Sequence, residues 1–327
     1  MKTQARLKDL RPGDSLVGFY IIKSKRVRQT RDNNFFIDID LQDSSGTLNA
    51  KLWDDFDKLK DAFERGDVVK IEATVEEYRD QPQARIKRVR KVLEGEAVDW
   101  SELLPKTSED IEQMYAEVRQ MIEELKNPHL KELLYFFFDD EELVQKIKSA
   151  PAARNIHHAY LGGLLEHLWH MAKIGRAVVR EVYPRLDYDL VMAGILLHDL
   201  GKIQELEFSP AISYSKLGYL EGHIFLGLKM LDEKLRKLPS FPDELRLQLE
   251  HIILSHHGEK EWGSPVLPAT PEAMLIHQID NLDAKLTIVL EAISRDLNQA
   301  EDFTNYHQTL ERHLYKRRPD EDGGDEP

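Results

Sequence analysis

The 327-residue chain is acidic, with a net charge of −14, contains no cysteine and is 41% apolar. The absence of cysteine excludes disulfide bonds, cysteine-based zinc sites and a thiol nucleophile, so a metal would have to bind through His, Asp and Glu. The first residues lack the apolar core of a signal peptide, and no apolar run approaches the roughly 20 residues that span a bilayer. We therefore predict a soluble, cytoplasmic protein without a membrane partner.

Charge is distributed unevenly along the chain. Residues 1–92 carry 20 Lys and Arg against 16 Asp and Glu, a net charge of +4, which leaves −18 for the rest. A basic first part on an acidic body indicates a local module that binds polyanions, although ordinary scatter of charge would give the same pattern. Five acidic residues lie in 318–327, which we predict to be a disordered tail.

The first 92 residues have the pattern of a small β-barrel. Strand-like stretches, with one short helical stretch after the third, follow one another at 15–27, 33–41, 47–53, 54–64 (helical), 68–75 and 83–92. Three strands, a short helix and two further strands is the order of an oligonucleotide/oligosaccharide-binding (OB) barrel. The stretches 46–50 and 66–69 resemble the third and fourth strands of such barrels in nucleic-acid-binding proteins.

Aromatic and basic side chains on this barrel are candidates for binding a single strand, because stacking on bases and pairing with phosphates do not depend on sequence. The candidate stacking residues are Phe19, Phe35, Trp53 and Tyr78. The candidate phosphate contacts are Lys23, Lys25, Arg26, Arg28, Arg79, Arg85, Lys87 and Arg88. The alternative for the aromatic residues is that most of them fill the core of the barrel.

Helical periodicity dominates after a linker at 93–108. We expect Thr107 or Ser108 to cap the first helix of a domain that covers 109–317. The expected helices are 109–126, 129–138, 140–149, 158–182, 189–199, 221–237, 242–256, 271–296 and 299–317. Because strand patterns are lacking there, we predict a multi-domain fold, an N-terminal all-β OB barrel followed by an all-α helical bundle.

Histidine is concentrated in the helical region, where twelve of the thirteen lie beyond residue 150. The pair His198-Asp199 ends the most apolar stretch of the chain, where burying an imidazole and a carboxylate without partners is costly. Four more apolar helices are interrupted by His or Asp, at His167, His223, His256-His257 and Asp280. A lone histidine in such a helix is usually a core residue, but five interrupted helices indicate a metal site.

The ordered set His167, His198-Asp199 and Asp280 is identified as the H…HD…D signature of the HD phosphohydrolase superfamily, in its form with an extended ligand set. The longer motifs that contain or flank these residues lie at 150–167, 196–202, 255–258 and 280–285. Together they resemble the YhaM-type 3′→5′ exoribonucleases, a family that joins a nucleic-acid-binding barrel to an HD domain. The resemblance extends over roughly residues 14–315.

The resemblance implies a first divalent metal at His167, His198, Asp199 and Asp280. Asp199 would bridge to a second metal, because a carboxylate has two oxygens, and that metal would also be held by His223 and His256. His257 would either complete this second site or face the substrate phosphate. Manganese is the expected ion, with Fe, Co, Ni, Zn or Mg as alternatives.

Four further residues are candidates for a role at this site. Lys202, about one helical turn past Asp199, would bind a phosphate oxygen or steady the leaving group, or else is a solvated lysine. Arg154 and His158 could contact phosphate, and His158 could protonate the leaving oxygen. Helix capping or packing is the alternative for both. Asp283 could orient a ligand or replace Asp280.

These features lead us to expect a metal-dependent 3′→5′ exonuclease that hydrolyses single-stranded RNA to nucleoside monophosphates, and single-stranded DNA is left open as a second substrate. The direction of cleavage comes only from the family resemblance. One alternative is an HD hydrolase of small nucleotides such as dNTPs, cyclic dinucleotides or ppGpp. Another is a nucleic-acid-binding adaptor with a relict HD domain. Homo-oligomerisation is left open.

Overall fold

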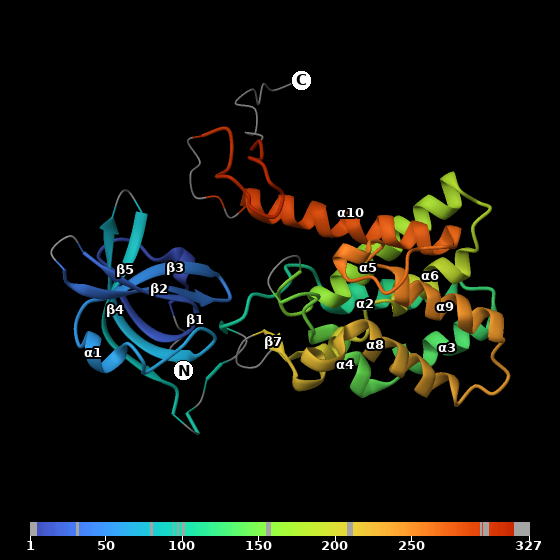
Figure 1. The fold of residues 1–327 in the computed structure, drawn as a ribbon, viewed down its shortest axis with the longest axis horizontal. Coiled ribbons are helices and arrows are strands. Elements are labelled where there is room, and N and C mark those ends of the chain that lie inside the picture. Colours follow the sequence, from blue (N-terminus) through green and yellow to red (C-terminus); the bar gives the residue numbers. More distant parts are fainter. Residues whose placement is uncertain are drawn as a thin grey trace, which may run out of the picture.

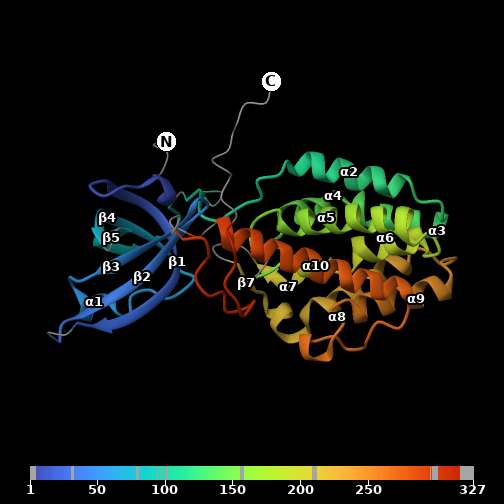
Figure 2. The same cartoon turned by 90° about the horizontal axis from the view of Figure 1, so that it is seen from above.

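The fold is known from a computed structural model, in which a β-barrel and a bundle of helices lie side by side (Figures 1 and 2). The residues that it describes are 5–30, 33–78, 81–93, 95–96, 98–99, 102–154, 158–207, 212–294, 296 and 301–316. The predicted order, an OB-like barrel followed by a helical domain, is confirmed.

The barrel is closed, with its strands in the order β1-β2-β3-β5-β4. Its elements are β1 (Ser15–Gln29), β2 (Phe35–Asp43), β3 (Gly46–Leu52), α1 (Phe56–Leu59), β4 (Val68–Tyr78) and β5 (Gln81–Lys91). The pair β3–β5 is parallel and the others are antiparallel. Closure leaves no free sheet edge, so the outer faces and loops remain for contact with a ligand.

Alternation of apolar and polar residues sets which side of each strand faces the barrel interior. In β2, Ile37, Ile39 and Leu41 are fully buried, whereas the intervening Asp38 and Asp40 are only partly covered. The two carboxylates lie on the outer face, where both accept hydrogen bonds from the Asn49 side chain of β3. The period-two pattern therefore gives the barrel an apolar core and a polar outer surface.

The second part of the chain is mainly helical. Its helices are α2 (Ile111–Glu123), α3 (Pro128–Phe138), α4 (Glu141–Ser149), α5 (Gly163–Ala177), α6 (Tyr188–Leu197), α7 (Lys202–Glu205), α8 (Lys216–Leu235), α9 (Asp243–Ser255) and α10 (Pro271–Ser294). Side chains at Asp110, Asn127, Asp140 and Asp187 accept hydrogen bonds from the first backbone N–H groups and fix four of the helix starts. The predicted cap at Thr107 or Ser108 is wrong, because Asp110 caps α2.

Two predictions about this part of the chain need correction. The domain is not wholly α, because β6 (Leu206–Glu207) pairs with β7 (Ser213–Tyr214). The predicted helix at 299–317 is wrong for the described residues 301–316. There, isolated β-bridges join Phe303 to Tyr315 and His307 to Arg312, and the backbone N–H of Thr304 donates to Leu314. Pairing across a turn replaces the helical hydrogen bonds that the apolar spacing suggested.

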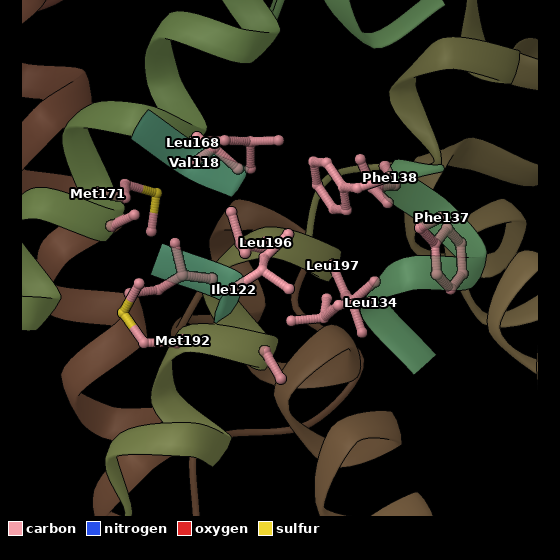
Figure 3. Close-up of a cluster of buried hydrophobic side chains, with 14 of the residues drawn as sticks. Val118, Ile122, Leu134, Phe137, Phe138, Leu168, Met171, Met192, Leu196 and Leu197 are labelled. Carbon is pink, nitrogen blue, oxygen red and sulfur yellow. The ribbon is translucent and has the colours of Figure 1, made fainter. Parts of the chain in front are cut away.

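The helical core surrounds α6. Side chains of α2, α3, α5 and α6 interdigitate in it, and Figure 3 labels ten of the residues. Every residue of 189–197 is buried, so α6 runs through the middle of the domain rather than along its surface. Its carboxyl end, and the His-Asp pair that follows, must therefore also lie inside the domain.

A third, smaller apolar cluster joins the barrel to the helices. Ile21 and Val68 of the barrel pack with Leu103 and Leu104 of the connecting segment, and Leu161 and Ile212 of the helical part pack against them. The connector therefore contacts both domains. Among the described residues, none of the helices combines the length and the apolar character needed to cross a bilayer.

Truncation of a core leucine should measure the contribution of this packing. Leu134 in α3 is fully buried, and we expect Leu134→Ala to lower the free energy of unfolding by about 2–5 kcal/mol, because it leaves a cavity. Leu247 in α9 is 60% exposed, so Leu247→Ala should change it by less than about 0.5 kcal/mol. Urea unfolding followed by circular dichroism measures both; equal effects would contradict the assignment of the core.

Candidate metal centre

Five helical elements converge on one buried point. His167 comes from the middle of α5, His198 and Asp199 follow α6, and the other candidates come from α8, α9 and α10. His198 and Asp199 are 0% and 1% exposed, which agrees with the burial of α6. Within 4.8 Å of one another lie possible ligand atoms of His167, His198 and Asp199, of His198, His256 and Asp280, and of His223, His256 and His257.

The two carboxylate oxygens of Asp199 face different histidines. Its Oδ2 lies 3.6 Å from His167 Nε2 and 3.4 Å from His198 Nε2. Its Oδ1 lies 3.6 Å from His223 Nε2 and 3.5 Å from His256 Nε2. The carboxylate is thus placed between two pairs of imidazoles, with one oxygen directed to each pair.

Hydrogen bonds on the far side of each imidazole hold its Nε2 toward Asp199. The Nδ1 atoms of His198 and His256 lie 2.8 Å and 2.7 Å from the backbone oxygens of Ile195 and Ile253. Because a carbonyl can only accept, Nδ1 carries a proton in both rings, which leaves Nε2 as the nitrogen that can bind a metal ion.

The lone pairs on these inner nitrogens need a partner. In the described part of the chain, the buried Nε2 atoms of His198, His223 and His256 and the Oδ1 atom of Asp199 have no hydrogen bond. Buried polar atoms rarely lack a hydrogen bond, because burial removes their bonds to water and no other interaction compensates for the loss. Imidazole nitrogens directed at a shared carboxylate fit the binding of divalent metal ions, which would supply the missing partners.

The electrostatics of the site separate the histidines. Burial lowers the pKa of His256 well below its usual value, and the charges of neighbouring histidines lower it further. His256 is therefore neutral, the form that binds a metal. Burial also acts to lower the pKa of His167, but hydrogen bonds and charges from Asp280 and Asp283 outweigh it and raise that pKa to about 9. A metal ion at His167 would displace this proton.

Asp280 and His257 lie at the more open side of the site. Asp280 Oδ1 is 3.4 Å from His167 Nε2, and its side chain is 17% exposed. The Nδ1 atom of His257 lies 2.9 Å from the backbone oxygen of Trp262, which leaves its Nε2 available on the side of His223 and His256. Both roles predicted for His257 are compatible with this position.

Lys202 contacts Asp199 directly. Its Nζ donates to Asp199 Oδ2 at 2.5 Å, and the lysine is nearly buried. Burial acts to lower the pKa of Lys202, but the charge of Asp199 outweighs it and raises the pKa. The alternative of a solvated lysine is therefore wrong. The ammonium group lies within the site, beside the carboxylate that the histidines surround.

A second carboxylate, Asp283, orients histidines from behind the site. One helical turn after Asp280 on α10, its Oδ2 lies 2.7 Å from His167 Nδ1 and 2.9 Å from His158 Nε2. Its Oδ1 lies 3.1 Å from His170 Nδ1. Of the two roles predicted for Asp283, the geometry favours orienting a ligand over replacing Asp280, because Asp283 faces the outer nitrogen of His167.

The predicted general-acid role of His158 finds no support in this geometry. The residue is fully buried, and its Nδ1 contacts the Tyr160 hydroxyl at 2.8 Å while its Nε2 faces Asp283 and Thr287. Both ring nitrogens are therefore already engaged, and the packing alternative describes its position better. His157, its neighbour in the motif, lies outside the described residues.

One supporting residue, Glu205, was missed in the sequence. Its Oε1 accepts a hydrogen bond from the backbone N–H of His223 and lies 3.1 Å from His223 Nδ1. The contact depends on a kink in α8 at Gly222, where φ is 70°, because His223 begins the second segment of that helix. Its position six residues after Asp199 is the only signal that the sequence offers.

The predicted aromatic residues of the barrel fall into two groups. Phe35 and Tyr78 are about half exposed, and Trp53 stacks on Phe36 at 4.4 Å between ring centroids on the outer face. Phe35 and Tyr78 are therefore exposed on the surface, and Trp53 is partly exposed there. Phe19 packs against the cluster that joins the barrel to the helices, so the prediction that it stacks on bases is not supported.

The predicted basic residues also differ in their surroundings. The Nζ of Lys25 donates to the backbone oxygens of Lys60 and Phe63 and is nearly buried, which argues against a phosphate contact. The exposed basic side chains are those of Lys23, Arg26, Arg28, Arg85, Lys87 and Arg88, and Arg28 pairs with Asp38 at 2.7 Å. Arg79 lies outside the described residues.

The fold and the site define an HD-domain protein that carries an OB barrel. The family model for the HD domain matches residues 164–285 of this chain, and the family model for the OB-fold nucleic acid binding domain matches residues 21–92. The 3'-5' exoribonuclease YhaM of Bacillus subtilis (strain 168) is 35% identical over 283 residues, which cover 86% of this chain and 89% of that protein. The chain belongs to the family of YhaM-type 3′-5′ exoribonucleases.

Two solved structures of single-stranded-DNA-binding or OB-fold proteins match part of the chain. The second OB-fold domain of replication protein A from Methanococcus maripaludis is 13% identical, covers 30% of this chain and 100% of that chain, and gives a TM-score of 0.23. The mitochondrial single-stranded DNA binding protein Rim1 of S. cerevisiae is 14% identical, covers 25% of this chain and 99% of that chain, and gives a TM-score of 0.23. No conclusion about function rests on these two matches.

Gly201 allows α8 to approach the His-Asp pair, so a side chain there should disturb the site. A Cβ on Gly201 would lie 1.9 Å from the backbone oxygen of His223. We expect Gly201→Ala to destabilise the protein by about 1–3 kcal/mol and to weaken manganese binding, because His223 must move. At Gly227, which faces Gly201, a Cβ would meet nothing closer than 3.7 Å.

The matched control is therefore Gly227→Ala. It should leave manganese binding unchanged and stability unchanged or slightly higher, because alanine favours a helix. Thermal unfolding and calorimetric titration with Mn²⁺ measure both properties. Equal effects of the two substitutions would mean that the close approach at Gly201 does not set the position of His223.

Proposed function

We propose that this protein is a metal-dependent 3′→5′ exonuclease that hydrolyses single-stranded RNA to nucleoside monophosphates, with single-stranded DNA as a further substrate. The observation that carries the proposal is the placement of Asp199, whose two oxygens face separate pairs of histidines. The chain also belongs to a family with exoribonuclease activity and carries a nucleic-acid-binding barrel.

The site is proposed to hold two divalent ions, manganese by preference. His167, His198, Asp199 and Asp280 would hold the first. His223, His256 and His257 would hold the second, with Asp199 shared between them. When bound, the ions would supply a nucleophilic hydroxide and neutralise charge on the phosphate. This arrangement is supported by the two oxygens of Asp199, because Oδ2 lies near His167 and Oδ1 lies near His223.

The protein's own residues keep this site ordered. Asp283 and Glu205 hold the outer nitrogens of His167 and His223, which fixes the direction of the inner nitrogens. Burial removes competing water from the histidines. Lys202, whose ammonium group donates to Asp199, is proposed to bind a phosphate oxygen of the substrate.

The two domains would have different roles, with the strand bound by the barrel and hydrolysed in the HD domain. We propose a nucleic-acid-binding domain at 1–92, a linker at 93–108, an HD domain at 109–317 and an acidic tail at 318–327. The exposed basic side chains Lys23, Arg26, Arg85 and Arg88, with Phe35 and Trp53, would hold the strand. Arg154 is proposed to contact phosphate near the metal centre. A cytoplasmic location stays a prediction.

A small-nucleotide hydrolase is the second candidate, because its chemistry would use the same metal centre. The barrel favours the nuclease, since a hydrolase of dNTPs or cyclic dinucleotides has no evident use for a surface that binds a long strand. An adaptor with a relict site is disfavoured, because every predicted ligand position carries a His or Asp in one of the clusters, and hydrogen bonds orient His198 and His256.

Incubation with Mn²⁺ and 5′-labelled single-stranded RNA tests the proposal. The label should stay on a ladder of progressively shorter strands. Asp199→Asn keeps the shape of the side chain but removes its charge, so we expect the rate to fall by at least about 1000-fold while strand binding persists. Asp243→Asn, the same change at the exposed start of α9, should leave the rate unaffected.

A strand that stays intact with wild-type protein, together with rapid hydrolysis of dNTPs, would favour the small-nucleotide hydrolase instead. Loss of strand binding in Asp199→Asn would mean that the carboxylate also holds the structure together, and circular dichroism would reveal this.

The barrel's role is tested by charge reversal on β5. Arg85→Glu with Arg88→Glu changes two exposed side chains, and we expect roughly tenfold weaker binding of a 20-nucleotide RNA at 0.15 M salt. The slope of log affinity against log salt should become shallower by about one to two. Arg236→Glu with Lys237→Glu, two exposed positions after α8, is the matched control; identical slopes in both variants would count against the barrel.

A further inference from the structure

An exposed pair of tyrosines lies beside the metal centre. Tyr214 of β7 and Tyr219 of α8 meet edge to face, with ring centroids 5.6 Å apart and planes at 82°. The guanidinium carbon of Arg154, from the segment before α5, lies 5.6 Å from the centre of the Tyr214 ring. Three segments of the chain thus combine two aromatic rings with a positive charge, and we call these three residues the tyrosine platform.

The platform is open to solvent. Tyr219 is 77% exposed and Tyr214 is 40% exposed, and the neighbouring Leu217 and Leu220 are 49% and 75% exposed. A cluster of large apolar side chains on the surface contributes little to folding and is typical of a binding site. Because both tyrosine side chains are exposed, a planar group can approach the rings.

Backbone contacts tie the platform to the metal centre. Tyr214 pairs with Leu206, which directly follows Glu205, the residue that holds His223. Ser215 strengthens the connection, because its hydroxyl donates to the Gln204 backbone oxygen and accepts from the N–H of Gly218. The backbone that carries the two tyrosines is therefore joined to the segment that holds His223.

The platform also lies next to the barrel. Ile212, two residues before Tyr214, packs against the apolar cluster that contains Ile21 and Val68 of the barrel. Figures 1 and 2 both place β7 at the edge of the helical domain that faces the barrel. A strand that runs from the barrel to the metal centre would meet the platform between them.

We infer that Tyr214 and Tyr219 stack on bases of a single-stranded nucleic acid near its reacting 3′ end and that Arg154 pairs with an adjacent phosphate. The inference rests on the proposed function and adds a positioning site to it. Stacking is tolerant of base identity, which suits an enzyme that advances along any sequence. Paired bases cannot offer their faces in this way, so the platform also selects single strands over duplexes.

A nucleic acid fits this surface better than a protein partner. The platform places a guanidinium beside aromatic rings, a combination that serves both the phosphate and the base of one nucleotide. It also lies between a barrel of a nucleic-acid-binding type and a candidate phosphodiesterase centre. A contact with another protein would not require either neighbour.

The test uses full-length protein with Asp199→Asn, so that the strand is not degraded. A single-stranded RNA carries the fluorescent base 2-aminopurine at one of its last four positions in turn, because stacking on an aromatic ring quenches its emission. We expect quenching at one or two positions. Adding Tyr219→Ala should restore the emission and weaken affinity roughly tenfold, whereas Tyr219→Phe, which retains the ring, should preserve both.

Tyr183→Ala is the matched control. Tyr183 is 58% exposed and precedes α6, whose opposite end carries His198, about 15 Å along the helix. This substitution should change neither quenching nor affinity. Because Tyr219 is more exposed than Tyr183, its replacement should leave the fold intact, and circular dichroism checks this.

Failure of the inference about the tyrosine platform can be distinguished from failure of the proposed function. If Tyr219→Ala binds and quenches like its parent while wild-type protein still shortens RNA, the platform inference is overturned and the proposed function stands. If Tyr219→Ala alters only the sedimentation of the protein, the surface serves contacts between protein chains and the inference is again overturned. If wild-type protein shortens no RNA, the proposed function itself fails, whatever the fluorescence shows.

Discussion

A buried carboxylate surrounded by imidazoles is the interaction on which the rest of this structure depends. Asp199 is held at the inner end of α6, where water cannot stabilise its charge, so the surrounding side chains must do so. Lys202 offsets that charge, and the histidines direct their inner nitrogens toward it. The burial of α6, the close approach at Gly201 and the kink at Gly222 all place groups around this one carboxylate.

Hydrogen bonds to the outer nitrogens of the histidines set the direction in which their inner nitrogens point. Backbone oxygens fix His198 and His256, while the carboxylates of Asp283 and Glu205 fix His167 and His223. Asp280 and Asp283 also raise the pKa of His167, so a proton and a metal ion would compete for that ring. The same contacts link the site outward, because Glu205 leads directly into β6 and the tyrosine platform.

The barrel and the helices are joined by contacts rather than only by a tether. The apolar cluster at Ile21, Val68, Leu103 and Leu104 fills the junction, and β7 lies beside it. This junction gives the connecting segment a packing role that its composition does not suggest. It also places the barrel beside the part of the helical domain that carries β7.

The sequence by itself determined the domain order and the set of candidate ligands. Period-two alternation defines a barrel, and polar residues inside apolar helices stand out because their burial is costly. The sequence could not determine which nitrogen of each histidine points inward or that Glu205 supports His223. It also could not show that His158 lies behind the site or that residues 301–316 do not form a helix. Those features depend on contacts between residues far apart in the chain, and only tertiary packing decides which of them meet.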